Sequence, residues 1–310
     1  MGGEMASSDG PDDVLWRVNF DEFNRRFRHK SCVALVRQKM GGAAAAVLAA
    51  MLRLSRPHEA DVREERSPPL SESKIHAEVL DVFAPGDPSS PTKADISSTL
   101  DLLSLDGNDL VTLTGEGPGG KAYCVNMKRI IDVIRIKEVE AVVRERFGAP
   151  TCRIFRLLAL KGLLEMRQIA DMAMVPQHAT REYLYRLLKA GYVRLQEVAK
   201  SADHAPSRTF YLWRVELLGA VEQLGVDLYR AASNIRGRLA YQMEKEAELL
   251  KLLEQVEAAR RAEREGRPAL AAPVVTPAQQ QQLKHLQSVV QALETSLMRL
   301  DELILIFRVL

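Results

Sequence analysis

Cysteines and aromatic residues are scarce in this sequence, and each scarcity excludes a class of protein. The three cysteines, Cys32, Cys124 and Cys152, stand far apart, so they form neither a disulfide framework nor a zinc-binding spacing. This cysteine usage is typical of a reducing compartment. Aromatic residues make up 5% of the chain, while Ala, Leu, Arg and Glu dominate. Such a composition favours helices over sheets.

Long apolar runs are also missing. No stretch approaches the ~20 apolar residues that a membrane-spanning helix needs, and the apolar run at 41–50 suits a buried helix. The first residues, MGGEMASSDGPDD, lack the basic and apolar segments of a secretory signal. We therefore expect no contact with a membrane.

The common catalytic motifs are absent too. The sequence contains no GxxxxGK[ST], GxSxG or HExxH pattern. The glycine-rich GEGPGG at 115–120 lies between two predicted strands rather than before a helix, so it predicts a hairpin turn instead of a phosphate-binding loop. We expect no catalytic residue, metal, cofactor or small-molecule substrate. An enzyme whose site is assembled from residues distant in sequence is the alternative that this search leaves open.

Charge is unevenly distributed, although the net charge is only +2. Residues 151–214 carry eleven Lys and Arg against five Asp and Glu, whereas residues 71–150 carry nine against thirteen. A basic segment is where contact with nucleic acid is expected, and for the acidic segment we expect contacts with protein.

Hydrophobic periodicity and turn residues divide the chain into six segments. We predict disorder over 1–14, a helical segment over 15–55, a linker over 56–70, winged helices over 71–148 and 149–214, and a coiled-coil hairpin over 215–310. The winged helices are predicted from short helices followed by two short strands around a polar or glycine-rich turn. The predicted fold class is mainly α, with tandem winged-helix domains followed by an antiparallel C-terminal coiled-coil hairpin.

The basic segment holds the candidate DNA-binding residues. Its third helix is predicted to begin near Pro176, to end before Gly191 and to bury Leu184, Leu187 and Leu188. In a helix-turn-helix arrangement this helix enters the major groove. The candidates on its opposite stripe and on the flanks of the wing are His178, Arg181, Tyr185, Lys189, Lys200 and Arg208. The alternatives are solvated charges or contacts with an acidic protein.

Apolar residues at alternating three- and four-residue spacing predict the C-terminal hairpin. The seam consists of Leu217, Val221, Leu224, Leu228, Ile235, Leu283, Leu286, Val290, Leu293, Leu297, Leu300, Ile304 and Phe307. The chain is predicted to be helical from 216 to 264, and three prolines within 265–277 separate the two parts of the seam. A short connection favours folding back into an antiparallel pair, and dimerisation through the seam is the alternative.

Four stretches of sequence resemble one protein family. They are WRVNFDEFNRRFRHKSCVALV at 16–36, VVRERFGAPTCRIFRLL at 142–158, QIADMAMVP at 168–176 and LQEVAKSADHAPSRTFYLW at 195–213. They are similar to the winged-helix and coiled-coil subunit of eukaryotic RNA polymerase III, which is related to the large subunit of the general factor TFIIE. The resemblance runs from about Leu15 to the C-terminus.

The resemblance implies a non-catalytic nuclear subunit with winged helices and a coiled coil, in which residues 15–55 are the helical remnant of a winged-helix domain. Such a subunit joins two smaller subunits in an initiation subcomplex that docks on the clamp of the largest subunit and aids promoter opening at tRNA and 5S rRNA genes. Promoter DNA is a further expected contact. The family's first winged helix and much of its second are missing before Leu15, so we expect a truncated gene model, a splice form or a diverged paralogue. The alternative function is a free-standing winged-helix DNA-binding regulator that dimerises through its coiled coil.

Overall fold

The structure, a computed structural model, describes residues 17–81, 91–117, 120–199, 209–265 and 275–310. The predicted disorder of residues 1–14 lies outside this part of the chain. The described residues form two compact units, one ending at Asp132 and the other spanning Val133–Val309.

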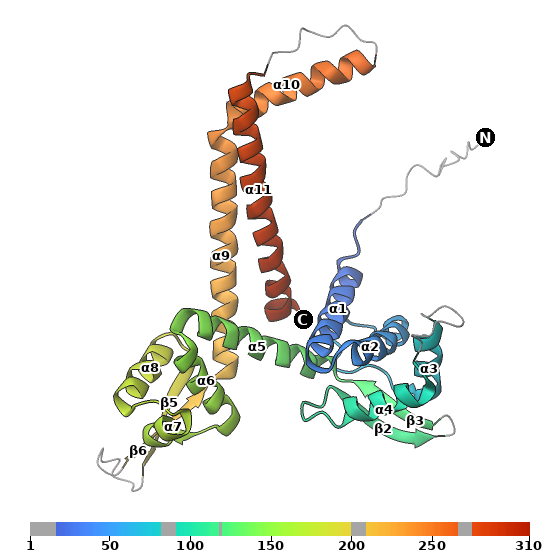
Figure 1. The fold of residues 1–310 in the computed structure, drawn as a ribbon, viewed down its shortest axis with the longest axis vertical. Helices are drawn as coiled ribbons and strands as arrows, with labels where there is room; N and C mark the ends of the chain where they lie inside the picture. Colours follow the sequence, from blue (N-terminus) through green and yellow to red (C-terminus); the bar gives the residue numbers. More distant parts are fainter. Residues whose placement is uncertain (1–16, 82–90, 118–119, 200–208, 266–274) are drawn as a thin grey trace, which may run out of the picture. The chain divides into compact units, whose positions relative to one another are not determined.

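The first unit begins with two helices and continues into a small three-stranded sheet (Figure 1). Its elements are α1 (Phe20–Met40), α2 (Gly42–Ser55), β1 (Leu70–Ser71), α3 (Glu72–Asp81), α4 (Lys93–Ser104), β2 (Val111–Gly117), β3 (Gly120–Val125) and the start of α5 (Met127–Phe147). The side chain of Asn19 caps α1 by accepting a hydrogen bond from the backbone N–H of Glu22. Gly41, at φ 95°, allows the sharp turn between α1 and α2.

Helix α2 is the first helix of the winged-helix module in this unit. It packs against both α3 and α4, and the sheet has the order β1-β3-β2 with antiparallel pairing. The predicted boundary at residue 71 therefore differs from the structure, in which the module begins with α2. The difference arises because Val47, Leu48 and Met51 of α2 are buried in the core that covers the sheet.

The segment at 56–70 is packed rather than a linker. Ser67 is buried, and its backbone N–H donates to the Val125 carbonyl at 2.9 Å. The buried Glu59 carboxylate accepts from the Arg28 guanidinium at 2.8 Å and contacts the His29 ring at 2.9 Å. These long-range contacts hold a polar, proline-containing segment against α1 and the sheet.

The second unit contains a second winged helix with the same element order. Its elements are the rest of α5, then α6 (Ala149–Lys161), β4 (Leu164–Glu165), α7 (Met166–Ala173), α8 (Gln177–Lys189), β5 (Val193–Ala199) and β6 (Thr209–Val215). The strand order β4-β6-β5 repeats that of the first sheet. Phe155, Tyr192 and Trp213 are buried in its core, where Phe155 and Tyr192 make an edge-to-face contact. The predicted mainly α fold with tandem winged helices is confirmed.

The C-terminal hairpin pairs α9 (Leu217–Lys245) with α11 (Pro277–Ile304), which run side by side in Figure 1. Their antiparallel direction brings Arg308, in the π-helical turn at Leu305–Val309, to the Glu222 carbonyl near the start of α9. Every predicted seam residue is buried or half-buried. The predicted antiparallel hairpin is therefore confirmed.

One helix departs from the predicted hairpin. The helix expected to run from 216 to 264 is interrupted at Glu246, and α10 (Ala247–Arg264) follows in a different direction (Figure 1). Helix α11 starts at a capping box in which the Thr276 and Gln279 side chains each bond the other's backbone N–H. The apolar seam loosens after Ile235, so α10 lacks the regular stripe that would hold it on α11.

Helix α5 fixes the base of the hairpin within the second unit. Its Arg146 forms an ion pair of 2.5 Å with Asp227 of α9. About three turns earlier in α5, the Arg135 guanidinium donates to the Ile306 carbonyl at 2.9 Å. The two contacts connect α5 both to α9 and to the turn that follows α11, which are the two arms of the hairpin. Within the described residues, no helix combines the length and apolarity needed to cross a membrane.

Candidate nucleic-acid interface

The turn between α7 and α8 sets the orientation of the candidate recognition helix. Met174 adopts a left-handed conformation at φ 52°, and Pro176 is the residue that precedes the first turn of α8. The buried Thr180 hydroxyl donates to the Pro176 carbonyl at 3.1 Å. The short turn therefore packs α8 across α7, which is the geometry of a helix-turn-helix motif.

One side of α8 is buried and the other is open to solvent. Leu184 and Leu187 are fully buried, and Leu188 is half-buried. On the opposite side the structure exposes all four predicted residues of the helix, which are His178, Arg181, Tyr185 and Lys189. We call these four residues the α8 stripe.

Tyr185 is held in place by an aromatic contact. Its ring meets the Trp213 ring edge to face, with centroids 5.6 Å apart and an angle of 87° between the planes. Trp213 is only 4% exposed, whereas Tyr185 is 54% exposed. The buried indole thus orients an accessible phenol at the surface, a group that can stack on or hydrogen-bond to a nucleic acid.

Ion pairs neutralise several cations of this module but leave the α8 stripe charged. Arg186 pairs with Glu182 at 2.5 Å, and Arg214 pairs with Glu216 at 3.2 Å. Among the described residues, no carboxylate forms an ion pair with Arg181 or Lys189. These two cations are therefore available to phosphate oxygens.

The wing is only partly described. Lys200 and Arg208, predicted to flank it, lie outside the described residues. The strands β5 and β6 around them expose Val198, Phe210 and Tyr211. Val198 and Phe210 are directly opposite each other in the strand pairing. These apolar residues and Trp213 were not among the predicted site residues, although the alternation in TFYLWRV (209–215) would have placed Trp213 on the core face.

The first module presents a different surface at the same helical positions. Aligning its buried Leu100 and Leu103 in α4 with Leu184 and Leu187 in α8 gives the four residues that correspond to the α8 stripe. They are Ala94, Ser97, Asp101 and Leu105.

None of these four α4 residues is basic. Asp101 accepts hydrogen bonds from Lys121 at 2.9 Å and from the Tyr123 hydroxyl at 3.2 Å. The Lys121 hydrogen bond holds the pKa of the Asp101 carboxyl below its ordinary value. Leu102 of α4 and Leu105, the residue that directly follows the helix, are 60% and 80% exposed. The surface of α4 thus suits contact with protein, and that of α8 suits contact with an anion.

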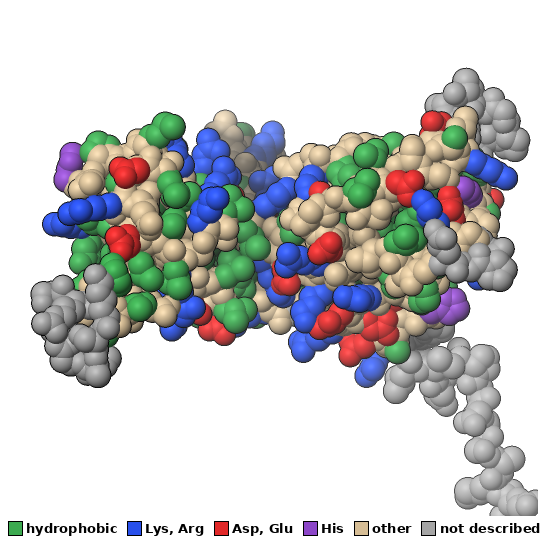
Figure 2. Space-filling model, turned by 90° about the horizontal axis from the view of Figure 1, so that it is seen from below, with side chains coloured by type: hydrophobic (Ala, Val, Ile, Leu, Met, Phe, Trp, Pro, Cys, Tyr) green, Lys and Arg blue, Asp and Glu red, His purple; other side chains and the backbone are tan. Residues whose placement is uncertain are grey.

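Basic and hydrophobic side chains lie among one another on the face drawn in Figure 2. Figure 2 shows Lys and Arg side chains set among hydrophobic ones on the face turned to the viewer, without an unbroken basic field.

Among the described residues, no three His, Cys, Asp or Glu side chains lie where they could hold a metal ion. The buried Cys152 has a pKa raised by desolvation, which disfavours its reactive thiolate form.

Two family models match this chain. Residues 4–134 match the family described as RNA polymerase III subunit RPC82, and residues 139–215 match the C-terminal winged-helix domain of POLR3C. The chain is 31% identical over 301 residues to the DNA-directed RNA polymerase III subunit RPC3 of Homo sapiens. This match covers 95% of the chain and 55% of the human protein.

Two further relatives give the same result. The chain is 32% identical over 255 residues to the RPC3 subunit of Danio rerio, which covers 82% of the chain and 46% of that protein. It is 29% identical over 252 residues to the rpc3 subunit of Dictyostelium discoideum, which covers 79% of the chain and 37% of that protein. The chain spans about half the length, or less, of these curated relatives.

Proposed function

The chain belongs to the family of RNA polymerase III subunit RPC3, and from this premise we propose that it acts as a non-catalytic subunit of DNA-directed RNA polymerase III. The observation that carries the proposal is the similarity over 95% of the chain, which includes both winged helices and the hairpin. The relatives are named as subunits of RNA polymerase III, and the same assembly is the role proposed for this chain.

The proposed mechanism is one of rigid surfaces rather than chemistry. The two winged helices and the α9/α11 hairpin would serve as docking surfaces for two smaller subunits of an initiation subcomplex and for the clamp of the largest subunit. The Arg146–Asp227 ion pair and the Arg135 hydrogen bond support this role, because they fix the hairpin to α5. A nuclear location follows from the proposed assembly.

The exposed leucines of α4 support a protein contact for the first module. Leu102 and Leu105 are large apolar side chains in open solvent, and exposed apolar side chains that lie together mark protein interaction sites. The module lacks cations at the positions that face DNA in a winged helix. We therefore assign its α4 surface to another subunit.

The α8 stripe supports a contact between the second module and promoter DNA. Arg181 and Lys189 would neutralise phosphates, and Tyr185 would pack against the sugar or the bases at an opened promoter. With one arginine in the stripe, the helix lacks a set of bidentate base contacts. The proposed binding is therefore mostly electrostatic, with little preference for sequence and a strong dependence on salt. Such contacts would aid promoter opening without selecting the promoter.

Mapping the tagged chain on chromatin tests the function directly. The expected result is occupancy of tRNA and 5S rRNA genes, coincident with the largest subunit of RNA polymerase III. A free-standing winged-helix regulator would instead occupy palindromic sites as a symmetric dimer, because half-site spacing mirrors the protein's two-fold axis. Occupancy of such sites without the polymerase would overturn the proposal.

A further inference from the structure

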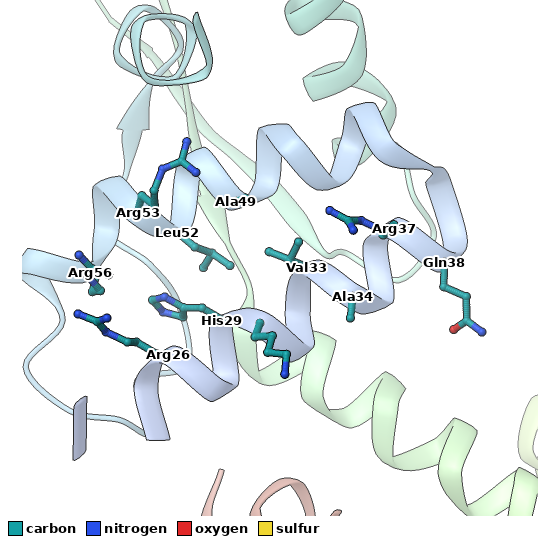
Figure 3. A pocket seen from close by; sticks show the side chains of 11 residues that line it. Arg26, His29, Val33, Ala34, Arg37, Gln38, Ala49, Leu52, Arg53 and Arg56 are labelled. Atoms are coloured by element: carbon teal, nitrogen blue, oxygen red, sulfur yellow. The ribbon is translucent and has the colours of Figure 1, made fainter. Parts of the chain in front are cut away.

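The first unit contains a groove between α1 and α2 whose lining includes no residue of α4. Its volume is about 640 Å³. Its apolar floor is formed by the half-buried Val33 and Ala49 above the fully buried Leu52, and the side chains of Val33 and Leu52 lie between the two helices in Figure 3. Ala34, also in the lining, is exposed. On α1 the lining runs from Arg26 to Gln38, about 18 Å of helix axis at 1.5 Å per residue, which is room for about three turns of a bound helix.

The rim of this groove is basic. Its lining contains six basic side chains and no acidic one: Arg26, His29, Lys30, Arg37, Arg53 and Arg56. Figure 3 shows Arg26 and Arg56 at one end of the groove and Arg37 near the other.

Neighbouring carboxylates offset only part of this charge. His29 contacts the buried Glu59, and Arg53 forms an ion pair of 2.7 Å with Glu78. Glu22 lies within 2.8 Å of Arg26 and 4.0 Å of Arg56, and it also binds Arg25, so one carboxylate serves three guanidinium groups. An excess of positive charge therefore surrounds an apolar floor.

We propose that the groove between α1 and α2 binds an acidic amphipathic helix of a partner protein. Apolar side chains at i, i+3, i+4 and i+7 of such a helix would cover Val33, Ala34 and Ala49. Its carboxylates would face the arginines at the rim, whose planar guanidinium groups pair with carboxylates in two-point geometry. Nucleic acid fits less well, because its phosphates would use the rim and leave the apolar floor exposed to water.

This inference goes beyond the proposed function. It concerns α1 and α2, and neither the α8 stripe nor the exposed leucines of α4 take part in it. It would hold for a polymerase subunit and for a free-standing regulator alike.

The test measures binding of a labelled peptide to the full chain by fluorescence anisotropy. The probe is a peptide of about four helical turns with Leu at i, i+3, i+4 and i+7 and Glu at most other positions. Three competitors accompany it: the same peptide with Ala for Leu, the same peptide with Lys for Glu, and a DNA duplex. We expect the Glu/Leu peptide to bind at least about tenfold more tightly than each competitor, because only this peptide has apolar side chains for the floor and carboxylates for the basic rim.

Two variants locate the binding to the groove. Arg37→Glu reverses a rim charge that has no ion pair among the described residues, and we expect it to weaken binding by about five- to tenfold at low salt. Ala34→Trp places a large ring on the exposed lining of α1 and should block the floor without disturbing the core. The matched control is Lys74→Glu, an equal charge change on the exposed surface of α3 in the same unit. It should change the affinity by less than about twofold.

Several results would overturn the inference. Failure of the Glu/Leu peptide to bind would do so, as would equal losses for Arg37→Glu and Lys74→Glu. If the Ala-for-Leu peptide bound as tightly as the Glu/Leu peptide, the apolar floor would contribute nothing and the binding would be nonspecific charge attraction. Tighter binding of the duplex, sensitive to Arg37→Glu, would assign the groove to nucleic acid instead. Circular dichroism of each variant shows whether it keeps the helical content of the parent chain.

Discussion

The salt dependence of DNA binding is the sharpest prediction for the α8 stripe. Each cation that contacts a phosphate releases counterions, and the slope of log K against log salt falls by about 0.9 for each such contact. Arg181 and Lys189 are exposed and form no ion pair with the described carboxylates. If both contact phosphates, the double variant Arg181→Gln/Lys189→Gln should lower the magnitude of the slope by about 1.8.

The structure supplies a matched control on the same helix. Arg186 is also exposed, but it already pairs with Glu182 at 2.5 Å. Because its charge is offset by that carboxylate, Arg186→Gln should change the slope by less than about half a unit. The comparison separates a phosphate contact from a general loss of positive charge.

The assay is a titration of labelled duplex DNA with the full chain at several salt concentrations. The duplex is given an unrelated sequence, because phosphate contacts carry no sequence information. The double variant should bind all sequences more weakly by a similar factor. Equal slopes for the parent, the double variant and Arg186→Gln would refute the assignment of the α8 stripe to DNA.

The remaining predictions concern stability and assembly. Glu59→Gln leaves the buried Arg28 guanidinium without its counter-charge, and urea unfolding should show a loss of about 3 to 5 kcal/mol. Burial raises the pKa of Glu59, but the hydrogen bond and charge of His29, the charge of Arg28 and the hydrogen bond from Ser55 together hold it below its ordinary value. The stability that this lowered pKa contributes is fully present above pH 4.5 and is lost as the pH falls through the pKa of Glu59 in the folded protein. Glu59→Gln should therefore make the free energy of unfolding less dependent on pH in the acid range. Leu286→Ala removes the most buried residue of α11, and thermal unfolding should report a loss of about 2 to 3 kcal/mol in the hairpin. Leu102→Glu/Leu105→Glu should leave unfolding within about 0.5 kcal/mol of the parent yet abolish co-purification of a partner subunit, and unchanged co-purification would contradict the role of α4.

Much of the fold could be predicted from local pattern. The helix containing Leu184 and Leu187 follows from apolar spacing, and the antiparallel hairpin follows from a seam that repeats every three and four residues. The positions of the α8 stripe follow by elimination, because residues opposite a buried stripe face solvent. These features depend on neighbours within one or two turns of helix.

Features that depend on distant partners could not be predicted. The segment at 56–70 reads as a linker because its buried Glu59 finds Arg28 only after α1 has folded against it, 31 residues away in the sequence. The assignment of α2 to the following module rests on its packing against α3 and α4. The helix is interrupted at Glu246 without a glycine or proline there, so no local sequence signal predicts where α9 ends.

The corresponding positions of the two modules explain how similar folds can take different partners. Asp101 and Tyr185 occupy the same place on α4 and α8, and each contacts an aromatic residue of the central strand, Tyr123 or Trp213. In the first module the Asp101 carboxylate is bound to Lys121. In the second module the Tyr185 phenol is exposed between Arg181 and Lys189. The two modules have similar cores and different exposed surfaces. From that difference we infer that the first module binds protein and the second binds DNA.

Purification of the tagged chain from nuclear extract, followed by identification and counting of the proteins that accompany it, tests membership in the polymerase most directly. The account predicts recovery of RNA polymerase III subunits with one copy of this chain per assembly, counted by native mass spectrometry. Recovery of the chain alone, as a dimer of two identical copies, would contradict the account and would favour a free-standing regulator.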